Sequence, residues 1–391
     1  MKTKSFSIYI FSQFAFWLSA VILSAALSSC AVAEPEPEPG KHIVPSGPLS
    51  AGFSVTLSSD HSGSSRAPGF LGEGYEKGEG YENYIDIEGG DYRVVIYSHD
   101  ETNPANSVCI GELAGIQILT EDIDEFAKKY TIRGILDAGT SGRIRQGDAV
   151  KFVFLANWHS RYQNATEGKT LDDLSQTQFG YNEDMTLLSA ENRVPMFGIT
   201  NPIHLQFDEN NYADIGTIHL LRAYAKVEVV CADEGAVIDK VRLVRHYSLG
   251  TFAPAGVYTQ DDYVHGSYDK DYTESPTIPS TAVVDATSLP FTKVDEKRWV
   301  IYVPEYDIER DPGVYPEIKI QFDGYPDEDV LYFQWYGTNS NNYFNILRNN
   351  WYRFTVRKSI YFSVKVDVMP YISVDLNPSF GFDQLLPKPN A

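Results

Sequence analysis

Apolar and polar residues alternate in short stretches along this chain. Near the start, Phe53, Val55 and Leu57 alternate with small polar residues, which is the period of two shown by a half-buried strand. Later stretches are rich in β-branched and aromatic residues and are separated by turn-forming residues. They predict strands within residues 84–100, 148–160, 220–233, 239–247, 298–306, 317–322, 329–337, 352–359 and 361–368.

Helical patterns are scarce by comparison. Residues 121–130 begin with acidic residues and end with lysines, as a short helix prefers. Residues 170–179 are a second candidate, with Thr170 as the N-cap. Many strands with few short helices predict an all-β protein built from antiparallel β-sandwiches rather than from alternating β/α units.

The chain is long enough for two such sandwiches. The roughly 340 residues after residue 52 exceed one ordinary sandwich of about 100 residues. A polar, turn-rich stretch at 207–216 suggests where the division falls. We therefore expect an N-terminal domain over 53–210 and a C-terminal domain over 211–391.

The first thirty residues have the pattern of an export signal. Lys2 and Lys4 precede an uncharged, largely apolar run over 5–29, and Cys30 follows a Leu-Ser-Ser sequence. This ending resembles the bacterial lipoprotein box, which implies that residues 1–29 are removed and that Cys30 carries lipid. An uncleaved membrane anchor is the alternative, because the run is long enough to span a bilayer. Residues 30–52 are acidic and rich in proline, which favours an extended linker.

Charge and cysteine content narrow the chemistry. A net charge of −21 over 391 residues argues against nucleic acid as a partner, because its phosphates would be repelled. Beyond Cys30 the cysteines are Cys109 and Cys231. Cys231 ends an alternating apolar set, which favours a buried thiol on a strand. A disulfide between the two stays open at this point.

No stretch carries a catalytic or cofactor motif. The chain lacks HExxH, a Walker loop, a GxSxG elbow and a GxGxxG turn, so we expect no enzyme activity, no cofactor and no resident metal. His159 and His246 fall at the ends of predicted strands. The acidic turn 323–329 could bind calcium, although it lacks the EF-hand pattern.

Several segments in order resemble the fimbrillin family, the lipoprotein precursors of type V pilus subunits. The first is the start, where Cys30, a linker and one strand precede a polar loop ending in Arg66-Ala67-Pro68-Gly69. The second and third segments are 91–100 and 151–160. The fourth is 194–200, followed by a stretch that contains Arg222, Ala225 and Lys226. The fifth and sixth are 346–356 and 362–371, and Tyr371 stands where the family often carries Trp.

That resemblance implies transthyretin-like sandwiches and a specific route of assembly. An arginine-specific protease would cut between Arg66 and Ala67 and so free the first strand. A strand from another subunit would then enter the vacated groove. The expected removable residues are Phe53, Val55 and Leu57, and the candidate donor residues near the C-terminus are Tyr371, Ile372, Val374 and Leu376.

The function implied by the resemblance is that of a structural subunit, shaft or tip, of a cell-surface fimbria. Its partners would be other pilus subunits, the protease, the outer membrane through the lipid, and host or bacterial surface ligands. The protein would begin as an outer-membrane lipoprotein and end in the fimbrium. Two alternatives stay open: a non-polymerising surface lipoprotein that binds glycan or protein, and a pilus anchor subunit.

Overall fold

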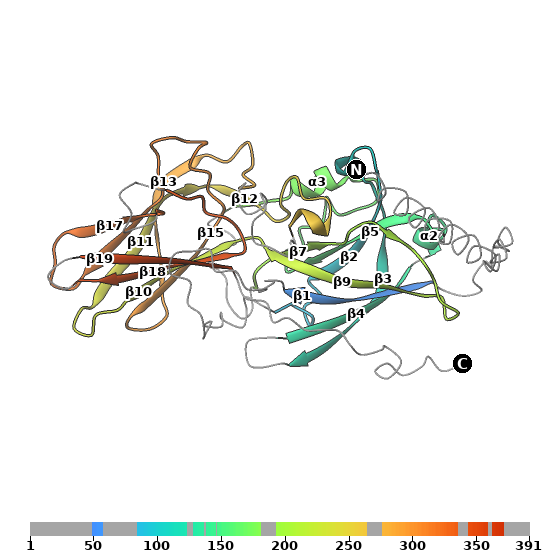
Figure 1. Ribbon diagram of the computed structural model, residues 1–391, viewed down its shortest axis with the longest axis horizontal. Coiled ribbons are helices and arrows are strands. Elements are labelled where there is room, and N and C mark those ends of the chain that lie inside the picture. The colour runs from blue at the N-terminus through green and yellow to red at the C-terminus, as the bar shows by residue number, and fades with distance from the viewer. Residues whose placement is uncertain are drawn as a thin grey trace, which may run out of the picture. The chain divides into compact units, whose positions relative to one another are not determined.

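β-Strands make up nearly all of the regular structure in the computed structural model (Figure 1). Helix among the described residues is limited to α2 (Ala138–Ser141), α3 (Leu171–Ser175) and two 3₁₀ turns, η3 (Pro104–Asn106) and η4 (Gln260–Asp262). The all-β class is therefore confirmed, while the division into two sandwiches stays a prediction. The structure describes residues 49–57, 84–122, 128–136, 138–145, 147–180, 193–263, 276–334, 343–358 and 362–370.

Seven strands close into a ring, because the last strand of the sheet pairs back with the first. Closure matters physically, since a closed sheet has no edge with unpaired backbone groups. The order around the ring is β2 (Tyr92–Ser98), β3 (Cys109–Asp122), β4 (Lys128–Leu136), β1 (Ser50–Leu57), β9 (Tyr212–Arg222), β7 (Met196–Ile199) and β5 (Ala149–Ala156), and the short β8 (Ile203–His204) also pairs with β5.

The remaining strands form three open sheets. The four-stranded and five-stranded sheets share one apolar core, to which Val241 and Leu243 contribute from β11 and Val227 and Val229 from β10. The five-stranded order is β14 (Thr292–Lys293), β15 (Arg298–Val303), β10 (Ala225–Cys231), β18 (Asn350–Arg357) and β19 (Ser363–Pro370). The four-stranded order is β13 (Val284–Pro290), β11 (Ile238–Tyr247), β16 (Glu317–Phe322) and β17 (Glu328–Tyr332), and β12 (Leu249–Thr251) pairs with β6 (Gln178–Gly180).

The expected division near residue 210 falls just before a ring strand. β9 pairs with β1 and β7, so the ring continues to Arg222. The chain then enters the five-stranded sheet at Ala225. All described residues belong to one compact unit, Gly47–Ala391.

One of the two predicted helices is confirmed in part: of residues 170–179, α3 covers Leu171–Ser175, and β6 already begins at Gln178. In α3, the Thr170 hydroxyl accepts a hydrogen bond from the Asp173 amide at 3.0 Å, and the Asp173 carboxylate accepts one from the Thr170 amide at 3.0 Å. This reciprocal pair is a capping box, and it explains why so short a helix forms here.

The helix predicted over 121–130 is wrong. β3 ends at Asp122 and β4 begins at Lys128, and their register sets Glu121 opposite Lys129 and Asp122 opposite Lys128. Two of the acids and both lysines that suggest a helix dipole are therefore cross-strand partners of opposite charge. The dipole effect is worth only about 0.3–1 kcal/mol, which is small beside the pairing of both strands within the ring.

A buried ion pair joins the segment after β15 to the segment before β18. The side chains of Arg348 and Glu305 are 1% and 4% exposed, and their Nε and Oε2 atoms lie 2.8 Å apart. Arg348 also donates to the carbonyl oxygens of Phe252 at 2.8 Å and Thr251 at 3.0 Å. Glu305 accepts a further hydrogen bond from the Thr277 amide at 3.1 Å. The pair is thus desolvated but well supplied with partners.

Replacing Arg348 with methionine should lower the free energy of unfolding by about 3–5 kcal/mol, because Glu305 would keep a buried charge without its cation. Urea unfolding measures the loss. Arg143→Met is the matched control, since the Arg143–Glu167 pair is 46% and 60% exposed, and losing an exposed pair costs under about 1 kcal/mol. Equal losses in the two variants would contradict this account of the Arg348–Glu305 pair.

Candidate functional site

The first strand occupies an interior position of the ring. β1 pairs antiparallel with β4, from Ser50 opposite Ile135 to Val55 opposite Tyr130. On its other side it pairs in parallel with β9, from Ser50 opposite Tyr212 to Leu57 opposite Leu220. Figure 1 shows β1 between these two strands. We call the space between β4 and β9 the β1 slot.

The walls of the β1 slot are apolar and buried. The register sets Phe53 opposite Ile132, and Val55 opposite both Tyr130 and Ile218. Ile132, Tyr130 and Ile218 are at most 1% exposed and belong with Ala51 to one core cluster. The predicted period of two in β1 therefore matches buried partners on both neighbouring strands.

Backbone contacts fix the entrance of the β1 slot. The Ser50 amide donates to the Asn211 carbonyl at 2.8 Å, and the Leu136 amide donates to the Leu49 carbonyl at 2.8 Å. Ala51 is fully buried and lies opposite Gly134 and Ala213 in the register. Small residues on all three strands allow them to approach closely at this end.

The other residues predicted for assembly lie outside the described part of the chain. These are the lipidation residue Cys30, the cleavage residues Arg66 and Ala67, and the candidate donor residues Tyr371, Ile372, Val374 and Leu376. The described residues do border both segments. β1 ends at Leu57, before the predicted cleavage loop, and β19 ends at Pro370, directly before the candidate donor. No helix among the described residues has the length and apolarity to cross a membrane.

Two motifs that are distant in the sequence meet where the chain leaves the ring. The guanidinium of Arg222, which is fully buried, donates to the Asn349 side-chain oxygen at 3.0 Å. The Asn349 amide donates to the Tyr224 carbonyl at 2.9 Å, with Asn349 in the left-handed region at φ 58°. The Lys226 ammonium lies 4.3 Å from the centre of the Trp351 ring. The Arg222 and 346–356 motifs therefore act together as structural contacts between β9, β10 and β18.

The cysteines and histidines of the described residues show no arrangement for chemistry. Cys109 and Cys231 are both buried and free, so the buried thiol expected at Cys231 is confirmed and the two are not joined. Burial raises the pKa of Cys109, which disfavours a reactive thiolate. His159 lies in the turn after β5, at φ 50°, and His246 is buried in β11. The described residues contain no group of three or more His, Cys, Asp or Glu suited to a metal ion.

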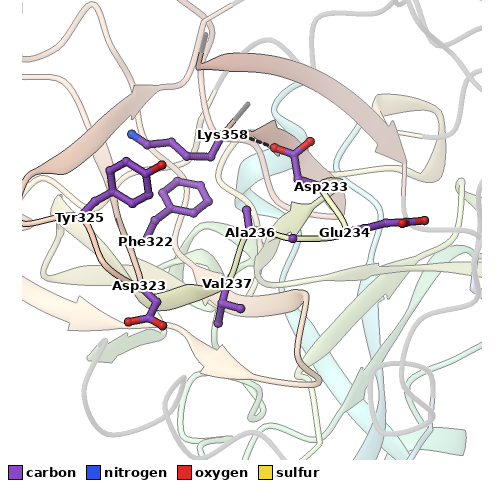
Figure 2. A pocket seen from close by; sticks show the side chains of 9 residues that line it. Asp233, Glu234, Ala236, Val237, Phe322, Asp323, Tyr325 and Lys358 are labelled. Carbon is purple, nitrogen blue, oxygen red and sulfur yellow. Dashed lines mark hydrogen bonds between the residues drawn. The ribbon is translucent and has the colours of Figure 1, made fainter. Parts of the chain in front are cut away.

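A second feature is an open pocket of about 400 Å³ (Figure 2), between the turn after β10, the turn after β16 and the end of β18. Lys358 forms part of the pocket wall. Its amide donates to the Asp233 carboxylate and its ammonium to that of Asp329. The ammonium also lies 5.3 Å from the ring centre of Phe322 and 4.9 Å from that of Tyr325. These contacts hold the pocket wall in place.

The rim of this pocket is acidic and aromatic. Tyr325 is 51% exposed, which is high for so large a ring. Glu234 and Asp323 also line the pocket and are exposed, and Figure 2 shows their carboxylates turned outward. The pocket therefore offers an aromatic face for stacking beside hydrogen-bond acceptors, which suits a small polar ligand.

Comparison with known proteins identifies a shared fold. No protein-family model matches the chain, and no curated protein matches it by sequence. The tip fimbrial protein Mfa3 from Porphyromonas gingivalis, in a C-terminally truncated form, matches in structure with a TM-score of 0.50 and 10% identity, over 82% of this chain and 99% of that one. This likeness shows that the chain shares the fold of Mfa3.

Two further solved structures match with lower scores. A candidate cell adhesion protein from Bacteroides uniformis has a TM-score of 0.43 and 11% identity, over 83% of this chain and 98% of that one. The fimbrial anchor protein Mfa2 from P. gingivalis has a TM-score of 0.34 and 8% identity, over 82% and 97% of the two chains.

The stability of the fold should fall as the pH drops below about 6.5, in part because of His246. Burial lowers the pKa of His246 below its ordinary value of 6.5, so the unfolded chain takes up the proton first. The stabilising contribution is therefore complete above pH 6.5 and is lost as the pH falls toward the folded-state pKa, at up to about 1.4 kcal/mol per pH unit.

Urea unfolding between about pH 7 and pH 5 measures this slope. His246→Gln should flatten the slope, whereas His204→Gln, at an exposed position, should leave it unchanged. An unaltered slope in His246→Gln would contradict the assignment.

Proposed function

We propose that this chain is a structural subunit, shaft or tip, of a cell-surface fimbria, and that β1 is removed during assembly. The observation that carries the proposal is the position of β1. It closes the ring, yet its partners β4 and β9 follow much later in the chain and neither is joined to it by a hairpin. It can therefore leave without breaking any other strand pairing. The shared fold with a protein described as a fimbrial tip protein supports this interpretation.

The proposed route begins with export. Residues 1–29 are removed, Cys30 is lipidated, and the chain is held at the outer membrane. An arginine-specific protease then cuts between Arg66 and Ala67. β1 stays paired until another subunit supplies a strand, which binds by main-chain hydrogen bonds while alternate side chains fill the apolar walls. Repetition of such a non-closing contact produces a filament.

Cutting is required because a tethered strand is hard to displace. While the chain is intact, the covalent link keeps the strand near the slot at an effective concentration on the order of millimolar. Burial of three large apolar residues adds on the order of 5 kcal/mol. Once the peptide bond is cut, β1 can diffuse away and a strand from another subunit can replace it. This chain would in turn donate a strand to the slot of a neighbouring subunit, through the candidate donor residues Tyr371, Ile372, Val374 and Leu376.

Fimbrial material sheared from cells that produce this protein should contain the chain with Ala67 as its first residue, in a ladder of high-mass bands on gels run under mild conditions. The variant Arg66→Ala should stay a membrane-bound monomer, because its first strand is never released. Arg145→Ala, at another exposed arginine, is the matched control and should assemble normally. A mature chain that begins at Cys30 or within residues 42–53 would contradict strand removal and favour an anchor subunit.

The pocket beside Tyr325 favours a second candidate function, the binding of a glycan, with or without polymerisation. Its support is the exposed ring next to carboxylates in an open hollow, an arrangement that suits sugar rings and their hydroxyl groups.

Titration of the purified chain with chitobiose, lactose and maltose, followed by NMR saturation transfer, tests this function. We expect at least one of them to bind, and Tyr325→Ala to weaken that binding about tenfold or more. Val330→Ala, at an exposed apolar position of β17, is the control and should bind as the unchanged protein does. No binding at millimolar sugar would exclude this function for neutral disaccharides.

A further inference from the structure

At Gly52, a side-chain contact links β4 and β9, the two strands that form the walls of the β1 slot. In the register, Gly52 lies opposite Arg133 on β4 and Asp214 on β9. The guanidinium of Arg133 lies over the ring of Tyr212, at 5.1 Å from its centre. Arg133 belongs to β4 and Tyr212 to β9, so this cation–π contact spans the strand between them. We call these two residues the clasp.

The clasp leaves no room for a side chain at Gly52. A Cβ atom there would lie 2.6 Å from the Tyr212 hydroxyl oxygen, 3.0 Å from Cε2 of the same ring and 3.1 Å from the Ile132 carbonyl oxygen. The first distance is far below van der Waals contact, and the third involves backbone. Any strand that lies in the slot must therefore lack a Cβ at this position, or it must displace the ring.

Tyr212 is itself held in position by the turn before β9. Its amide donates to the Asp208 carboxylate at 2.9 Å, and its carbonyl accepts from the Asp208 amide at 2.9 Å. Asn211 has the left-handed φ of 59° that the turn requires. The ring therefore begins from a fixed backbone, which limits how far it can move aside.

A bulge in β9 fixes the register of the occupant. Between Gly52 and Ser54 the partner on β9 advances from Asp214 to Thr217, one residue more than on β1. Gly216 lies within this step at φ 78°, as is usual for a bulge. A strand that slides by two residues would lose its match to this irregularity. The slot therefore requires a defined sequence: a small residue, then glycine, then large apolar residues at every second position.

The candidate donor of this same chain does not meet that requirement. When Ile372, Val374 and Leu376 are aligned with Phe53, Val55 and Leu57, Tyr371 takes the place of Gly52 and Pro370 that of Ala51. A register that uses the only glycine of this segment, Gly381, places Phe380 at the fully buried position of Ala51 and Gln384 at that of Val55.

We propose that Gly52 and the Arg133–Tyr212 clasp select the occupant of the β1 slot, and that after cleavage the slot takes a glycine-containing strand from a different subunit rather than the C-terminal segment of a second copy of this chain. This inference rests on the proposed strand exchange. The limit is steric and applies to one position: it is set by the Tyr212 ring, on which Arg133 lies, and by the Ile132 carbonyl oxygen.

The steric limit can be tested in the uncut full-length chain. Gly52→Ala should raise the hydrogen-exchange rate of the β1 amides about tenfold or more, because overpacking at the clasp favours local opening. In a Tyr212→Ala background the same substitution should have little effect. Gly235→Ala, where an added Cβ meets no atom within 4 Å, is the control. An equal increase with and without Tyr212 would overturn the role of the clasp.

Partner choice is tested on the chain after cutting at Arg66, by incorporation of labelled peptides. A peptide of residues 50–57 should enter the slot, its Gly52→Ala form should do so about tenfold less well, and a peptide of residues 371–378 should be excluded. Tyr212→Ala should restore entry of the Gly52→Ala peptide.

The cut chain alone should give no ladder of high-mass bands on gels run under mild conditions. A ladder, or entry of the 371–378 peptide, would overturn the choice of a different subunit. If no peptide enters, strand exchange itself fails, while the exchange rates in the uncut chain still decide the role of the clasp.

Discussion

Backbone hydrogen bonding on both sides of β1 keeps the seven-stranded ring closed. Each ring strand has a partner on either side, so the sheet has no edge among these seven strands. Loss of β1 alone would expose the inner edges of β4 and β9 together with the apolar residues that face the slot. The ring therefore depends on its first strand, and any strand that takes the place of β1 must restore this pairing to restore the ring.

The other sheets are stabilised differently. Their apolar core also includes ring residues such as Val95 and Leu221, and the buried Arg348–Glu305 pair holds the segment after β15 against the segment before β18. Arg222 and Asn349 hold the chain where it passes from the ring into the five-stranded sheet. These contacts involve desolvated charges with several partners each, which favours a single arrangement of the strands.

The sequence allows the local features of this fold to be predicted, but not the closed ring. Two local signals were predictable because each lies within a few residues. They are the alternation of apolar and polar residues in the segments that form β5, β11 and β16, and the Thr170 cap of α3. Closure depends on β2 pairing with β5 and on β1 pairing with β4 and β9, which are partners far apart in the chain. The β3–β4 hairpin shows the limit most clearly, because its acids and lysines satisfy a helix rule and a cross-strand rule equally well. Gly52 looks like an ordinary turn residue in the sequence, and only the position of Tyr212 reveals the steric requirement.

The register of β1 also has a mechanical consequence. Its hydrogen bonds to β4 and β9 lie across the strand direction, and they extend along both sides of the strand. A load applied along the axis of a strand in this slot is carried in shear, so that many hydrogen bonds must break together rather than one after another. A filament linked through such slots would resist tension far better than one linked by strands that can be peeled from one end.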